Sequence, residues 1–150
     1  MAVDSSLEAV VFDTVTLVDY YYTLVPDKPG EGARILGALR DAGVNLLAFS
    51  GFPEGRRSQL DFLPSDGVAF LAAAKAAKVK VSRPKKAFLI RGEDRVGAVA
   101  ETYARLAAAK INVTALDAVC AGAGRFGAIL WVKPRDVKKA AGVLGVVSLP

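Results

Sequence analysis

The sequence repeats itself after 67 residues, and this repeat limits the possible folds more than any other feature of the chain. Asp27 aligns with Asp94, 67 positions on, and the match continues without a gap. The other aligned pairs are Gly30 with Gly97, Leu39 with Leu106, Asn45 with Asn112, and Val44 with Ile111. A self-match at a fixed period of this size indicates two copies of one structural unit. We therefore expect two domains, residues 13–83 and 84–150.

Each copy shows strand and helix patterns in the order β-α-β-β-α-β. The first copy has strand patterns at 17–25, 44–49, 58–63 and 79–81, helix patterns at 30–42 and 67–77, and a loop at 51–56. The second has strands at 87–90, 113–120, 126–132 and 146–149, helices at 96–109 and 134–144, a loop at 92–95 and a turn at 122–124. This order predicts an α+β fold of two ferredoxin-like units, each with an antiparallel sheet and its helices on one face.

The high content of apolar residues predicts a globular chain with apolar surface that its own helices do not cover. Hydrophobic residues make up 53% and charged residues 23% of the chain. Units of about 65 residues bury only about 60% of their unfolded surface. Strand side chains alternate between faces, so Phe88, Ile90, Ile129 and Trp131 cannot all face the helices. We expect a homodimer that covers the open sheet faces.

The sequence features that bear on cellular location favour the cytoplasm. The chain has no run approaching the about 18 apolar residues of a membrane span. Its single cysteine, Cys120, follows Val119 in an apolar run and has no second cysteine to pair with. We expect a buried thiol in a reducing compartment, which makes the cytoplasm the predicted location.

The residue types that usually carry catalysis are missing. The chain has no histidine, so the commonest general base and metal ligand is absent, and Cys120 has no histidine to activate it. The glycine-rich segment Gly122-Ala123-Gly124 joins two predicted strands, whereas a phosphate-binding loop would lead into a helix. We expect neither an enzyme nor a metal or cofactor site.

The repeated loop before the first helix of each copy is the candidate binding site. Gly30 or Gly97 at a helix start would let a carboxylate approach unpaired N–H groups. Asn45 or Asn112 begins the next strand, which we expect beside that helix start, and the amide can both donate and accept. With Asp27 or Asp94 balancing an ammonium, these groups describe a site for an α-amino acid. The structural alternative is that the aspartates are N-caps and the glycines permit tight turns.

Residues 25–46 resemble the first loop, helix and second strand of an ACT domain, a small module that binds amino acids in many metabolic enzymes. The family pattern is Asp-x-Pro-Gly, an apolar helix, then Gly-[Val/Ile]-Asn. The second copy is similar but looser, because Val96 replaces the proline and Lys110 the glycine. The resemblance covers residues 17–149. In the family, ligands lie where two domains meet, with contacts from the loop of one and the asparagine strand of the other.

The resemblance implies which residues bind a ligand and what the protein does. The ligand-binding positions it carries over are Asp27, Gly30, Asn45, Asp94, Gly97 and Asn112. Glu31 stands where the family has an apolar residue, so its carboxylate would repel a ligand carboxylate or prefer a basic ligand. The implied function is an allosteric amino acid sensor of two tandem ACT domains, which regulates a metabolic enzyme in trans.

Two other functions remain open. RNA-recognition motifs share the β-α-β-β-α-β order, and Arg125, Phe126, Gly127 and Trp131 resemble their RNA-binding strand, with Phe88 in the matching first strand. Residues 84–150 hold 11 of the 20 basic residues and 5 of the 15 acidic ones. This excess of basic residues is consistent with nucleic-acid binding, but the solvated face of a helix explains it equally well. We regard nucleic acid as the less favoured partner. The third possibility is a ligand-free structural or adaptor dimer.

Overall fold

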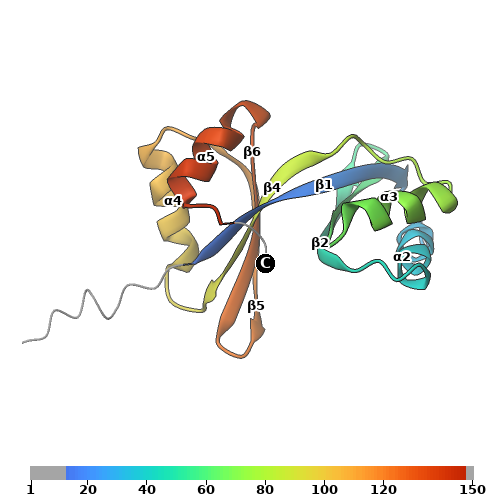
Figure 1. Cartoon of the computed structure of the whole chain (residues 1–150), viewed down its shortest axis with the longest axis horizontal. Helices are drawn as coiled ribbons and strands as arrows, with labels where there is room; N and C mark the ends of the chain where they lie inside the picture. The colour runs from blue at the N-terminus through green and yellow to red at the C-terminus, as the bar shows by residue number, and fades with distance from the viewer. Residues whose placement is uncertain (1–12, 148–150) are drawn as a thin grey trace, which may run out of the picture. The chain divides into compact units, whose positions relative to one another are not determined.

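The computed structural model describes residues 13–147, which divide into two compact units (Figure 1). The first unit is Val18–Lys86. The second unit consists of residues 13–17 and 87–147. Strands β1 (Thr14–Pro26) and β4 (Lys85–Glu93) contribute residues to both. Part of the strand predicted at 146–149 lies outside the described residues.

In the first unit, two helices cover one face of an antiparallel sheet. The elements that follow β1 are α2 (Glu31–Asp41), β2 (Leu46–Glu54), β3 (Arg57–Pro64) and α3 (Gly67–Ala76). The strands hydrogen-bond in the order β2-β3-β1. Helix α3 begins after Asp66, whose side chain accepts a hydrogen bond from the Ala69 N–H at 3.1 Å. Beyond α3 the chain returns to β1, where the Ser82 N–H donates to the Tyr22 carbonyl at 2.8 Å.

The core of the first unit is built around three aromatic rings. Phe70 of α3 stacks on Tyr21 of β1, with ring centroids 5.1 Å apart, and lies 5.4 Å from the ring of Phe62 in β3. Ile35 and Leu39, spaced one helical turn apart, bring the apolar side of α2 into the same cluster. The helical periodicity of the sequence therefore gives the face of α2 that packs on the sheet.

The second unit has the same arrangement of helices and strands. Its elements are β4, α4 (Ala98–Ala108), β5 (Val113–Gly122), β6 (Arg125–Val132), the 3-10 helix η1 (Pro134–Asp136) and α5 (Val137–Leu144). The strand order is β1-β4-β6-β5, so the first residues of β1 complete this sheet. The Val147 N–H donates to the Val15 carbonyl at 2.9 Å, and a single parallel bridge joins Val147 to Thr16.

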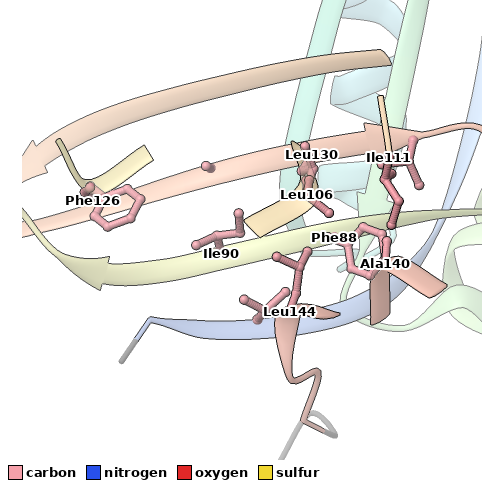
Figure 2. Close-up of a cluster of buried hydrophobic side chains, with 12 residues drawn as sticks. Phe88, Ile90, Leu106, Ile111, Phe126, Leu130, Ala140 and Leu144 are labelled. Atoms are coloured by element: carbon pink, nitrogen blue, oxygen red, sulfur yellow. The ribbon is translucent and has the colours of Figure 1, made fainter. Parts of the chain in front are cut away.

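Figure 2 shows the core of the second unit, where α4 and α5 pack on β4 and β6. Phe88, Leu106 and Leu130 are fully buried in it, with Ile90 and Phe126 close to full burial. Phe88 and Ile90 thus lie on the helix-covered face of the sheet. Ile129 and Trp131 alternate with Leu130 along β6 and are not members of this cluster.

The predicted α+β fold of two ferredoxin-like antiparallel units is confirmed. The strand predicted at 79–81 is wrong, because residues 79–84 run back beside β1 without forming a regular strand ladder. The domain boundaries 13–83 and 84–150 stay a prediction. The loop predicted at 51–56 is wrong, because β2 continues to Glu54 and only Gly55 and Arg56 form the hairpin turn to β3. Pro53 is tolerated there because β2 lies at the edge of its sheet, where an N–H is dispensable. Strand β4 likewise continues to Glu93, through half of the loop predicted at 92–95.

Cys120 is exposed, so the prediction of a buried thiol is wrong. It lies near the end of β5, an edge strand whose last six residues are all exposed. A hydrogen bond to Asp94 raises the pKa of the Cys120 thiol. The apolar sequence around the cysteine therefore belongs to an exposed hairpin and not to the core. None of the helices in the described part of the chain is both long and apolar enough to cross a membrane.

One carboxylate of the first unit is buried on the sheet face opposite the helices. Leu60 and Phe62 of β3 belong to the core, so Asp61 between them points to the other face. Its side chain is only 4% exposed and accepts a hydrogen bond from the Gln59 amide at 2.9 Å. Burial raises the pKa of Asp61, while the Gln59 hydrogen bond and the charge of Lys85 partly offset the rise.

This raised pKa predicts that Asp61→Asn makes the protein more stable at pH 7. A carboxyl whose pKa is raised in the folded state stabilises the fold below its unfolded pKa of about 3.9, and loses that contribution as pH rises through the folded pKa. The asparagine variant does not undergo that loss. In thermal unfolding from pH 4 to 8, the melting temperature of Asp61→Asn should exceed that of the wild type by an amount that increases with pH. Asp41→Asn, at the exposed end of α2, controls for simple loss of charge, and an equal gain there would contradict the prediction.

Candidate functional site

The repeated loops lead into α2 and α4 through glycines in the left-handed conformation. Gly30 has φ 96° and Gly97 has φ 77°, and each is the N-cap residue of its helix. Among residues 13–147 no side chain caps either helix. Asp27 instead accepts a hydrogen bond from the Ser58 hydroxyl at 3.1 Å, and the Asp94 N–H donates to the Gly124 carbonyl. The alternative in which the aspartates cap the helices is therefore wrong.

The start of α2 is open to an approaching group. A Cβ added at Gly30 or Gly32 would meet no atom within 4 Å. The first N–H groups of an α-helix have no partner within the helix, and the helix dipole makes this end positive. The first turn of α2 therefore offers uncapped N–H groups on an accessible surface, which suits a carboxylate.

Glu31 in this first turn is paired with two basic residues. Its carboxylate lies 3.2 Å from the Arg34 guanidinium and 3.8 Å from the Lys28 ammonium. Both cations are more than half exposed, whereas the Glu31 side chain is mostly buried. The repulsion of a ligand carboxylate expected from Glu31 is thus offset by Lys28, Arg34 and the helix dipole.

The second loop differs, because its arginine is engaged by two carboxylates. The Arg95 guanidinium donates to both Asp13 oxygens, at 3.0 and 3.2 Å. It also donates to Glu101 of α4 at 2.9 Å and to the Glu93 carbonyl at 3.0 Å. The hydrogen bonds to Asp13, and then to Glu101, raise the pKa of Arg95. The sequence gives no sign of this cluster, since Asp13 lies 82 positions from Arg95.

The two asparagines do not lie beside the helix starts of their own units. Asn45 and Asn112 are exposed and stand just before β2 and β5, after the C-terminal ends of α2 and α4. An 11-residue helix is about 16 Å long, so α2 separates Gly30 from Asn45 by about that distance. The expectation that each asparagine lies beside its own helix start is therefore wrong. The helices run antiparallel to the strands, so the strand after a helix begins at the far end of that helix. A single unit does not bring its loop glycine and its asparagine to one amino acid.

The aromatic residues proposed to stack on RNA bases are in the core. Phe88 and Phe126 both belong to the buried cluster under α4 and α5 (Figure 2). A base-stacking platform needs rings exposed on the open face of the sheet. The interpretation of these two residues as an RNA-binding surface is therefore wrong.

No protein-family model matches the chain, and no curated protein matches its sequence. Solved structures match it in fold. The chain is similar to protein BT0572 from Bacteroides thetaiotaomicron, with a TM-score of 0.76 and 16% identity, over 87% of this chain and 88% of that one. It is also similar to aspartokinase alpha and beta subunits, with a TM-score of 0.60 and 19% identity, over 91% and 96% of the two chains.

A third similar structure is the ligand-free regulatory subunit of aspartate kinase from Thermus thermophilus. Its TM-score is 0.58 at 16% identity, over 90% of this chain and 96% of that one. At such identities the likeness shows the fold alone. The chain has an ACT-like fold.

Proposed function

We propose that this protein is a regulatory module that binds an amino acid through its ACT-like domains and acts on a separate metabolic enzyme. The observation that carries the proposal is the start of α2, where the glycine N-cap leaves N–H groups uncapped and accessible. The ligand carboxylate binds there, near Gly30 and Glu31, and the site at Gly97 is its counterpart in the second copy. The likeness to a regulatory subunit of aspartate kinase supports a regulatory role.

The length of α2 determines which asparagine can complete such a site. Since Gly30 and Asn45 lie at opposite ends of α2, the asparagine that contacts the ligand comes from another ACT-like domain. A second copy of the chain supplies one in the homodimer that we propose. Asp27 or Asp94 balances the ammonium group of the ligand. Ligand binding then changes the association of the copies or their contact with the target enzyme.

The first test is a thermal-shift screen against the proteinogenic amino acids, followed by calorimetry on variants. A ligand at about 100 times its dissociation constant stabilises the folded state by about 2.7 kcal/mol. Asn45→Ala should weaken binding of the amino acid found by about tenfold to over a hundredfold, because one or two hydrogen bonds to a charged ligand are lost. Asn112→Ala tests the second copy in the same way.

The design of the variants follows from the backbone. Gly30 and Gly97 have positive φ, so a side chain there strains the fold whatever it does to a ligand. Gly32→Ala is the better probe of close approach at α2, since its Cβ meets no atom and its φ is not positive. Ser58→Ala, which removes the hydroxyl bonded to Asp27, tests whether Asp27 must be held in place. Unchanged affinity in Asn45→Ala, Asn112→Ala and Gly32→Ala would overturn the proposed site, and no shift with any amino acid would favour the ligand-free adaptor.

A further inference from the structure

The carboxylate of Asp13 occupies a space that exists only because residue 92 is glycine. A Cβ at Gly92 would collide with the Asp13 carboxylate and would lie 2.7 Å from Cε1 of Phe126. In the first copy the equivalent residue is Val25, a buried member of the core. The second copy thus has no side chain where the first has an apolar one. The carboxylate of Asp13, the residue just before β1, fills the space.

The contacts of this carboxylate are those of a specific carboxylate site. Two nitrogens of the Arg95 guanidinium bind the two Asp13 oxygens, the bidentate geometry that arginine forms with carboxylates. The Asp13 side chain is 12% exposed and that of Arg95 21%, so the pair is partly shielded from water. Glu101 and the Glu93 carbonyl bind Arg95 independently of Asp13. The arginine therefore keeps its position when the bound carboxylate changes.

We propose that Arg95, Gly92 and Phe126 form a binding site for a small carboxylate in the second unit, which Asp13 fills as an internal ligand. A ligand carboxylate binds by replacing Asp13 on Arg95. The site goes beyond the amino acid site proposed at α2, since it uses an arginine fork and not a helix start. Failure of either proposal leaves the other standing.

The tether of Asp13 determines which ligands compete with it. Asp13 is held against Arg95 by the folded chain, so its effective concentration lies far above that of a monocarboxylate at 100 mM, which therefore does not displace it. A ligand that binds the wild type needs contacts besides its carboxylate. Asp13 directly precedes β1, and β1 ends at Pro26, next to Asp27 of the first loop. Replacement of Asp13 therefore removes a side-chain contact just before β1, whose other end leads into the first loop.

The test is chemical rescue of Asp13→Gly by acetate, which has the same non-hydrogen atoms as the deleted side chain. We expect 100 mM sodium acetate at pH 7 to raise the melting temperature of Asp13→Gly by about 3–6 °C over 100 mM sodium chloride, if its dissociation constant is about 10 mM. Acetamide, which lacks the charge, should have no such effect. The wild type should respond equally to acetate and to chloride, because Asp13 already fills its site.

Matched variants test whether acetate binds in the space that Asp13 leaves and whether Arg95 holds it there. In Asp13→Gly/Arg95→Gln acetate should act no better than chloride, and Asp13→Ala should be rescued by formate, which fits the shorter gap. If Asp13→Gly is unfolded in chloride, recovery of folded protein in acetate is the same positive result. Equal effects of acetate and chloride on both Asp13 variants would overturn the proposal, as would an acetate effect that persists without Arg95.

Discussion

Leu106→Ala and Leu39→Ala are each expected to lower the free energy of unfolding by about 3–5 kcal/mol, because each leaves a cavity in a closed core. Leu106 is fully buried in the second unit and Leu39 is almost so in the first. The two leucines are equivalent in the repeat. Each also has a carbonyl that accepts a hydrogen bond from the N–H five residues on, at 2.9 Å in both copies. Urea unfolding monitored by circular dichroism measures both losses.

An exposed residue provides the control for the leucine variants. Val96 precedes α4 and is fully exposed, so Val96→Ala should change the free energy of unfolding by no more than about 0.5 kcal/mol. Trp131, the single tryptophan, lies in β6, and its fluorescence follows the second unit. A loss below 1 kcal/mol for both leucine variants would contradict the two cores described here.

The repeat and the helical periodicity were sufficient to predict the fold. The helix expected at 30–42 is α2, Glu31–Asp41, because Ile35 and Leu39 mark its buried face and Gly43 its end. Lys110 takes the place of Gly43 in the second copy and adopts the same left-handed conformation, with φ 59°. The looser sequence of the second copy thus keeps the backbone of the first.

The ends of the hairpins were not predictable from local patterns. Strands β2 and β5 are edge strands, and their outer residues are exposed on both faces. Their outer residues lack the burial alternation of a half-covered strand, so Pro53 and Gly55 indicated a loop. The apolar residues around Cys120 indicated burial, although no element covers them. Burial near a hairpin end depends on which other elements cover it, and single-sequence patterns do not contain that information.

The candidate site was predictable in its position but not in its contacts. Sequence alone located both loops at helix starts, since Gly30 and Gly97 recur there. It did not show that the glycines are themselves the N-caps, which depends on their positive φ. Nor did it show the pairing of Asp13 with Arg95, because no local sequence pattern joins two residues 82 positions apart.

Gly92→Ala is expected to lower the free energy of unfolding by about 2–4 kcal/mol, although it adds only one methyl group to a strand. The new Cβ meets the Asp13 carboxylate and Phe126 at distances that real Cβ atoms do not show, so a partly buried ion pair and an aromatic side chain must both move. Gly127→Ala on the neighbouring β6 is the control, because its Cβ would lie 3.9 Å from the Ile90 carbonyl, an ordinary contact. Its effect should stay within about 1 kcal/mol.

A double-mutant cycle identifies which neighbour of Gly92 is responsible for the loss. If the collision with Asp13 dominates, Gly92→Ala should cost less in the Asp13→Gly background than in the wild type, since the methyl group then enters the space that the carboxylate has left. Full additivity of the two substitutions would instead assign the cost to Phe126. A Gly92→Ala protein as stable as Gly127→Ala would contradict the close fit of Asp13 against Gly92. The carboxylate would then be held by Arg95 and its surroundings without the space that the glycine provides.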